Sequence, residues 1–294
     1  MTFAQPDQIS DLDTLLRMPA WVTSARSETL EDVAFLSGAA LNHLHLMLGR
    51  EGVPHALMQD RLALRAAEAC VTFSGRPERA RELRDLLHLL RPGDLPGPAG
   101  EIYLSWRRVT ERPVSVSVLC RAVPTLEQSQ IATWLNAGQG APVSRAAMVL
   151  ETVLMETPRA EALALILAEA SLARSLGWKH LIPLLAPGLK RADLCKQGDD
   201  LRLACLRALI ASAVETARIA GDLTRRAEHV KAVAPKLRAK GAAKAVEMFL
   251  ARDAVAAAAL PLPSRAARRL CDRLVELGAV RELTGRDTFR LYGV

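Results

Sequence analysis

The amino-acid sequence predicts a mainly α-helical protein: an N-terminal multi-helix domain followed by a C-terminal winged helix-turn-helix with a short β-hairpin. Apolar residues make up 50% of the 294 residues and aromatic residues only 4%, and the apolar residues are mostly Ala and Leu, which favour helices. Apolar positions recur at spacings of three and four along most of the chain, as on the buried face of a helix. Toward the C-terminus the elements become short, and Pro and Gly bound them closely.

This periodicity divides the chain into three parts. Residues 1–28, with Pro6 and Pro19 as breakers, are expected to be irregular. Residues 29–233 are expected to form the α-helical domain, and residues 234–294 the winged helix-turn-helix domain. Within the α-helical domain we expect helices over 30–48, 56–73, 77–90, 101–110, 126–136, 143–156, 159–176, 178–185 and 201–233.

Two stretches of the α-helical domain leave alternatives open. Gly221 interrupts the longest predicted helix at a cost of about 1 kcal/mol relative to Ala, so this stretch forms one helix, straight or kinked, or two helices. Residues 114–119 alternate β-branched residues in the manner of a strand. The preceding Pro113 and the lack of a neighbouring strand argue against that assignment.

The C-terminal part is built from short predicted elements. Asp253 and Ser264 are suitable N-caps for its second and third helices, and Gly278 is placed to end the third helix. Two prolines, Pro261 and Pro263, force a turn between these two helices. We expect helices over 242–250, 253–260 and 265–277, then strands over 280–283 and 288–292 joined by a turn over 284–287.

Positive charge is concentrated in the last quarter of the chain. From Ala217 to Val294 there are 16 Lys and Arg against 8 Asp and Glu, a net charge of +8. The remaining residues carry 23 basic and 24 acidic side chains, a net charge of −1, so they add nothing to the overall +7. A local excess of this kind is typical of a surface that binds a polyanion, although a solvated basic surface without a partner has the same composition.

The order of helix, helix, tight turn, helix and hairpin is that of a winged helix. Its third helix is narrow enough to enter the DNA major groove, about 12 Å wide, while the hairpin reaches neighbouring phosphates or the minor groove. Contacts to phosphates give an affinity that falls steeply with salt. The alternative is a winged helix that contacts protein, because Asp272 and Glu276 dilute the positive charge of the third helix. The candidate DNA-binding residues are Arg265, Arg268, Arg269 and Arg273 on the third helix and Arg281, Arg286 and Arg290 on the hairpin.

Several classes of function have no support in the sequence. We find no phosphate-binding GxxxxGK[ST] loop, no GxGxxG after a strand, and no HExxH, GxSxG or zinc-ligand cluster, so we expect no enzyme, no cofactor and no metal site. The five cysteines are widely spaced without a CxxC pair, which favours reduced thiols. No signal peptide and no membrane-spanning segment is evident, so we expect a cytoplasmic protein without a membrane partner.

Three segments of the chain resemble the signature stretches of a known bacterial family. They are LLRPGDLPGPAGEIYLSWRR at 89–108, VAPKLRAKGA at 233–242 and RRLCDRLVELGAVRELTGRDTFRLYGV at 268–294. The family is the domain of unknown function numbered 1403, which occurs in alphaproteobacteria, often on plasmids. The last segment is also similar to the winged helix that ends many Fic-type proteins. The Fic motif HPFxxGNGR is absent, so the resemblance does not imply AMP transfer and brings no catalytic residues.

Together these observations favour a DNA-binding protein, regulatory or associated with a plasmid or mobile element. Its partner would be double-stranded DNA, and its helical domain would dimerise, sense or recruit a protein partner. Substitution of Arg265, Arg269 or Arg286 by Ala is then expected to weaken DNA binding. The alternative is a non-catalytic adaptor or scaffold whose winged helix contacts protein, which would be indifferent to these substitutions.

Overall fold

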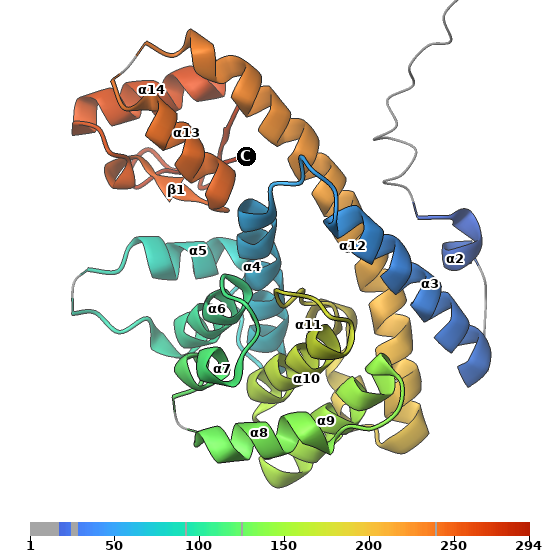
Figure 1. The fold of residues 1–294 in the computed structure, drawn as a ribbon. Helices are drawn as coiled ribbons and strands as arrows, with labels where there is room; N and C mark the ends of the chain where they lie inside the picture. Colours follow the sequence, from blue (N-terminus) through green and yellow to red (C-terminus); the bar gives the residue numbers. More distant parts are fainter. Residues whose placement is uncertain (1–17, 25–28, 92, 125, 239) are drawn as a thin grey trace, which may run out of the picture.

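The computed structural model describes residues 18–24, 29–91, 93–124, 126–238 and 240–294. Helices dominate these residues and a small three-stranded sheet accompanies them, which confirms the mainly helical fold class (Figure 1). The N-terminal helices are α2 (Ala20–Ser24), α3 (Leu30–Leu48), α4 (His55–Phe73), α5 (Ala80–His88), α6 (Gly97–Thr110), α7 (Val116–Ala122) and α8 (Gln128–Ala137). They are followed by α9 (Pro142–Glu156), α10 (Glu161–Ser175), α11 (Leu185–Gly188), the 3₁₀ turn η1 (Arg191–Cys195), α12 (Gly198–Val233) and the 3₁₀ turn η2 (Ala234–Lys236).

The longest helix, α12, connects the two ends of the molecule. Figure 1 shows α12 running from the helical body to the C-terminal elements, with α3 beside it. Gly221 lies buried inside α12 and does not interrupt it, so of the alternatives that the sequence left open the chain forms one helix and not two. Packing of α3, α4, α9 and α11 on α12 outweighs the cost of about 1 kcal/mol that a helical Gly brings.

Helix α4 lies at the centre of the helical body. It packs against α6, α10, α11 and α12, and also against α13 (Ala242–Ala251) of the C-terminal part. Its residues Leu57, Leu62 and Ala66 are fully or almost fully buried. A helix with apolar residues on most of its circumference is expected to be enclosed in this way.

Residues 114–119 do not form the strand that their alternation suggested and that Pro113 argued against. Residues from Val116 onward form α7, and the Ser115 Oγ caps this helix by accepting a hydrogen bond from the Val118 N–H at 3.3 Å. Only Pro113 takes part in β pairing, through an isolated bridge to His180. The N-cap therefore decides the local structure against the β propensity of the valines.

The helix expected over residues 178–185 is also wrong. Residues 181–184 have no regular secondary structure, and the short helix α11 begins only at Leu185. The Glu169 Oε1 of α10 accepts hydrogen bonds from the N–H groups of Leu184, Leu185 and Ala186, at 2.6, 2.5 and 3.2 Å. This buried carboxyl group, which lies 15–17 residues earlier in the chain, fixes where the helix starts.

The C-terminal segment, defined as residues 242–294, contains α13, the strand β1 (Val255–Ala256), the 3₁₀ turn η3 (Ala257–Ala259), α14 (Ser264–Glu276), β2 (Arg281–Glu282) and β3 (Leu291–Gly293). The strands are antiparallel in the order β1-β3-β2, with Tyr292 opposite Val255 on one side and Glu282 on the other. The predicted hairpin strands are confirmed in shorter form. The helix expected over 253–260 is wrong, because Asp253 is buried and β1 pairs with β3.

The segment expected to be irregular contains one short helix. Residues 1–17 and 25–28 lie outside the described residues, and Ala20–Ser24 between them form α2. Helix α2 packs on α3 and α12 through the buried Val22. Among the described residues, no helix combines the length and apolar character needed to cross a bilayer, and no cluster of three or more His, Cys, Asp or Glu side chains is placed to hold a metal.

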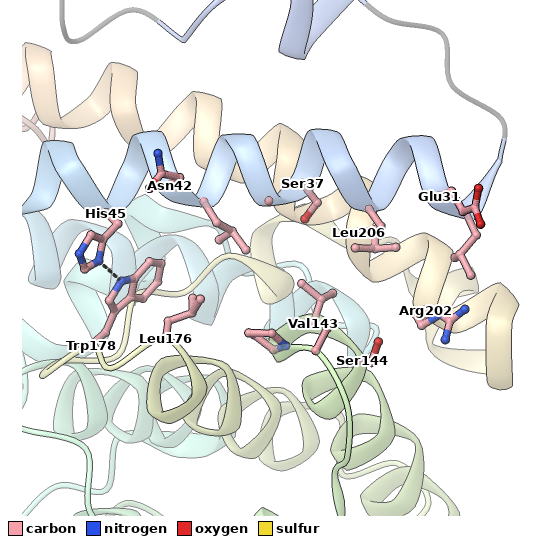
Figure 2. Close-up of a pocket in the computed structure, with 16 residues that line it drawn as sticks. Glu31, Ser37, Asn42, His45, Val143, Ser144, Leu176, Trp178, Arg202 and Leu206 are labelled. Atoms are coloured by element: carbon pink, nitrogen blue, oxygen red, sulfur yellow. Dashed lines mark hydrogen bonds between the residues drawn. The ribbon is translucent and has the colours of Figure 1, made fainter.

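An apolar groove with a volume of about 590 Å³ runs beside α3 (Figure 2). Ala34, Gly38 and Leu41 of α3 form one wall, and the first turn of α9 contributes to the opposite wall. The Trp178 indole closes one end by donating a hydrogen bond to the His45 Nδ1 at 2.9 Å. No local sequence pattern indicated this groove, because its walls come from four separate segments.

Glu169 is expected to make stability depend on pH. Burial raises the pKa of Glu169 to about 8. The hydrogen bonds that it accepts from three backbone N–H groups lower the pKa, but by less than burial raises it. An unfolded Glu titrates near pH ~4.3, so between this pH and the folded pKa only the folded protein holds the proton. The free energy of unfolding should therefore fall as the pH rises through this window, by up to about 1.4 kcal/mol per pH unit.

The variant Glu169→Gln tests this prediction because it keeps an acceptor for the three N–H groups and cannot titrate. Urea unfolding of both proteins at about pH 5 and about pH 8 should show the wild type losing stability relative to the variant at the higher pH. A difference between the two proteins that is the same at both pH values would contradict the assignment.

Candidate nucleic-acid interface

Helix α14 presents one apolar and one basic face. Its apolar face, Ala267, Leu270, Cys271 and Leu274, is buried as the spacing predicts. The helix begins at Ser264 without a side-chain capping hydrogen bond, and Gly278 follows it with a φ of +66°, which favours glycine. The opposite face of α14 points to solvent.

Three arginines occupy the exposed face in the first half of α14. Arg265, Arg268 and Arg269 are exposed, and none makes an ion pair or hydrogen bond with any described residue. The second half differs, since Arg273 pairs with Glu276 at 3.0 Å and Asp272 is exposed beside them. The dilution of charge expected for this helix is therefore confined to its C-terminal half.

The hairpin arginines are not equivalent. Arg281 on β2 is exposed and without a described partner, and it lines a shallow hollow together with Arg226 of α12. The Arg290 Nε donates to the Arg286 carbonyl at 2.8 Å, and its guanidinium lies 3.8 Å from Asp287. Arg286 forms an ion pair with Asp85 of α5.

The loop between β2 and β3 is held against the helical body. Arg81 of α5 donates to the Thr284 carbonyl, next to the ion pair of Arg286. Within the loop, Glu282 accepts from the Thr284 and Gly285 N–H groups at 2.7 and 2.8 Å. Burial would raise the pKa of Glu282, but these hydrogen bonds outweigh it and hold the pKa below its usual value. These contacts therefore hold the loop between β2 and β3 in one conformation.

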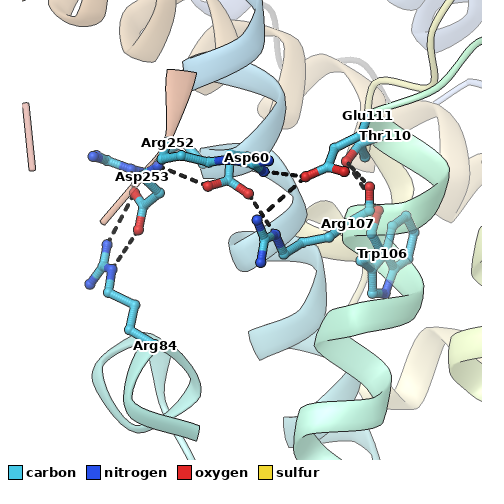
Figure 3. Close-up of polar contacts among 9 residues, drawn as sticks. Asp60, Arg84, Trp106, Arg107, Thr110, Glu111, Arg252 and Asp253 are labelled. Carbon is cyan, nitrogen blue, oxygen red and sulfur yellow. Dashed lines mark hydrogen bonds and ion pairs between the residues drawn. The ribbon is translucent and has the colours of Figure 1, made fainter. Parts of the chain in front are cut away.

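A buried polar network joins the C-terminal segment to the helical body (Figure 3). Its centre is Asp253, which is only 1% exposed. Asp253 accepts from the Arg84 Nε at 2.5 Å and the Arg84 Nη2 at 3.3 Å, and it also pairs with Arg61. Burial raises the pKa of Asp253, but Arg84 and Arg61 more than offset this, so the pKa lies below its usual value.

Asp60 of α4 extends this network. Its Oδ2 accepts from the Asp253 N–H at 2.8 Å, and its Oδ1 accepts from the Arg107 Nε at 2.9 Å. Glu111 then bridges Arg107, at 3.4 Å, to Arg252 of the C-terminal segment. Sequence reasoning missed this network; its one signal was the pair of charged residues, Asp60 and Arg61, inside a mostly apolar part of α4.

These contacts determine what the surface can do chemically. The network and the packing of α13 on α4 fix the C-terminal segment on the body, with the basic face of α14 directed outward. Guanidinium groups stay protonated and donate paired hydrogen bonds to phosphate or carboxylate. The arginines of α14 and β2 therefore suit anion binding rather than proton transfer.

Residues 6–294 match the family described as "Protein of unknown function (DUF1403)". No curated protein matches the chain.

Removal of the buried carboxylate should loosen the C-terminal segment. We expect Asp253→Asn to lower the free energy of unfolding by about 3–5 kcal/mol, because it leaves Arg61 and Arg84 without a counter-charge in a buried site. The stabilisation should be present above the pKa of unfolded Asp, about 3.9, and disappear as the pH falls through the lower folded pKa.

Urea unfolding followed by far-UV circular dichroism measures this destabilisation. The matched control is Asp287→Asn, because Asp287 is fully exposed and lies 3.8 Å from Arg290. The control should unfold like the wild type. Equal stability of Asp253→Asn and the control would show that the network is not needed for folding.

Proposed function

We propose that this chain, which belongs to the DUF1403 family, is a DNA-binding protein that uses its C-terminal segment as a winged helix. The same proposal includes a regulatory role or an association with a plasmid or mobile element, and double-stranded DNA as the partner. The proposal further includes that the family occurs in alphaproteobacteria and that the C-terminal segment is similar to the winged helix that ends many Fic-type proteins.

The topology of the C-terminal segment supports the winged helix. In that fold a strand follows the first helix, a helix-turn-helix comes next, and the hairpin after the recognition helix closes the sheet. The order α13, β1, η3, α14, β2 and β3, with β3 between β1 and β2, has this form. On this assignment η3 is the short second helix and α14 is the recognition helix.

The observation that carries the proposal is the group of unpaired arginines at the start of α14. Recognition helices of helix-turn-helix proteins contact base edges with their N-terminal residues. Arg265, Arg268 and Arg269 lie on that half of α14, exposed and without a described partner. Binding of phosphates or guanines by these three would break no existing ion pair.

The surroundings refine the contact set. Arg281 and Arg226 lie beside the C-terminal end of α14 and are suited to flanking phosphates. Arg286 would have to leave Asp85 before it could contact DNA. We therefore place the principal contacts on Arg265, Arg268, Arg269 and Arg281, and expect Arg286 to act mainly in holding the loop.

An adaptor is the second candidate, and one observation favours it. Phe289, near the tip of the hairpin loop, is 72% exposed and has a positive φ of 55°. An exposed aromatic side chain on a loop that α5 holds in place is typical of a protein contact. In this case Phe289→Ser would abolish co-purification of a partner protein, and substitution of the α14 arginines would have no effect on it.

Fluorescence anisotropy with a labelled duplex tests DNA binding. We expect Arg265→Ala, Arg268→Ala and Arg269→Ala, combined in one chain, to weaken binding at ~50 mM salt by a hundredfold or more, since each arginine contributes about 1–3 kcal/mol. The slope of log K against log salt should become shallower by about 0.9 for each phosphate that the variant no longer neutralises.

The control is Arg191→Ala, because Arg191 is exposed on η1 in the helical body. It should bind like the wild type. Absence of binding by the wild type to a long duplex at low salt would contradict the proposal. Equal binding by the triple variant would place the DNA contact elsewhere than α14.

A further inference from the structure

Beyond its first turn, helix α3 carries no Asp, Glu, Lys or Arg on any side. Residues 33–49 contain no Asp, Glu, Lys or Arg, in a chain of which 24% is charged. One face is buried in the body, through Val33, Ala40 and Leu44 among others. A helix on the surface normally carries charged residues on its outer face. The outer face of α3 does not.

The outer face of α3 instead exposes large apolar side chains. Phe35 is 68% exposed and Leu46 is 64% exposed, and their spacing of 11 residues places them on the same side of the helix, three turns apart. Small or uncharged residues, such as Ala39 and Asn42, lie between them. Trp21 of α2 extends this ridge, with its ring centroid 5.8 Å from that of Phe35. A contiguous exposed apolar surface of this kind marks an interaction site.

The apolar groove lies directly beside this ridge. Ala34 and Gly38, one turn apart, belong to its α3 wall, and their small size leaves room for close approach of another helix. The hydroxyl of Ser37, also in the lining, is buried and has no hydrogen-bond partner among the residues that the structure describes. One helix therefore carries both a projecting ridge and a hollow that fits a ridge.

We propose that a second copy of this chain covers α3, with the two α3 helices antiparallel about a two-fold axis near Gly38 and Asn42. A two-fold interface requires a patch that is complementary to itself. Here the ridge of each copy would enter the groove of the other, and Phe35 of one copy would meet Leu46 of its partner.

The charges at the two ends of α3 favour this orientation. Glu31 lies in the first turn and Arg50 just after the last turn, and neither makes an ion pair with a described residue. The antiparallel arrangement places each Glu31 opposite Arg50 of the other copy, whereas a parallel one would place like charges together.

Sedimentation velocity and light scattering on the full chain test this proposal, which does not depend on DNA binding. We expect a mass of twice 31.9 kDa. Phe35→Glu and Leu46→Glu should each raise the dissociation constant of the dimer by about a hundredfold or more, because each places an unpaired charge in the interface. Both side chains are exposed in the single chain, so the variants should keep its circular dichroism spectrum.

The matched control is Met155→Glu, because Met155 is 66% exposed on α9, outside this face. It should remain dimeric. Glu31→Arg and Arg50→Glu should each weaken the dimer about tenfold, and their combination should restore it, which an association through apolar contact alone would not show.

Three results would overturn the proposal. One is a monomer at every concentration up to about 100 µM. Another is a dimer that Phe35→Glu and Leu46→Glu leave unchanged. The third is a monomer that dimerises only when residues 1–17 are deleted, which would assign the groove to the chain's own N-terminal segment.

Discussion

The carboxylate of Asp253 is the point on which the position of the C-terminal segment depends. Burial of this charge costs several kcal/mol, and only the two guanidinium groups of Arg61 and Arg84 in their observed places offset that cost. Asp60 adds a second constraint on the position of the C-terminal segment, because it accepts one hydrogen bond from the Asp253 N–H and another from the Arg107 Nε. A displaced C-terminal segment would leave several buried charges unpaired. The network therefore selects one orientation of α14 against the body.

Local patterns predicted much of this structure, and long-range contacts explain where they failed. Helix α3 has its predicted bounds because caps and apolar spacing agree at residues 30–48. Asp253 was interpreted as a helix cap by a local rule, but its partner Arg61 lies 192 residues earlier in the chain. Ser115 shows a different failure, since one capping hydroxyl outweighed the strand-like alternation after it.

In the candidate site, too, local patterns predicted some features and long-range contacts determined others. Helical periodicity alone placed Arg265 and Arg269 opposite the apolar face of α14 and Arg268 on its flank, and in the structure all three are exposed. No local pattern indicated that Arg286 pairs with Asp85, which lies 201 residues earlier. Periodicity predicts which side chains leave the core. It cannot predict which of them a distant helix has already neutralised, and this decides which arginines remain free for an anion.

The molecule has charged groups in an internal interface and an apolar helix at its surface, the reverse of the usual arrangement. Helix α12 connects these two regions. Its N-terminal part lines the groove beside α3, and near its C-terminal end His229 Nε2 is 3.0 Å from the Leu277 carbonyl after α14. If α3 pairs with a second copy, the separation of the two α14 helices is set by rigid helices rather than by a linker. Half-sites in DNA are read one helical turn, about 34 Å, or a multiple of it apart. A rigid connection would therefore make the spacing between half-sites, as much as their sequence, a property that this protein can select.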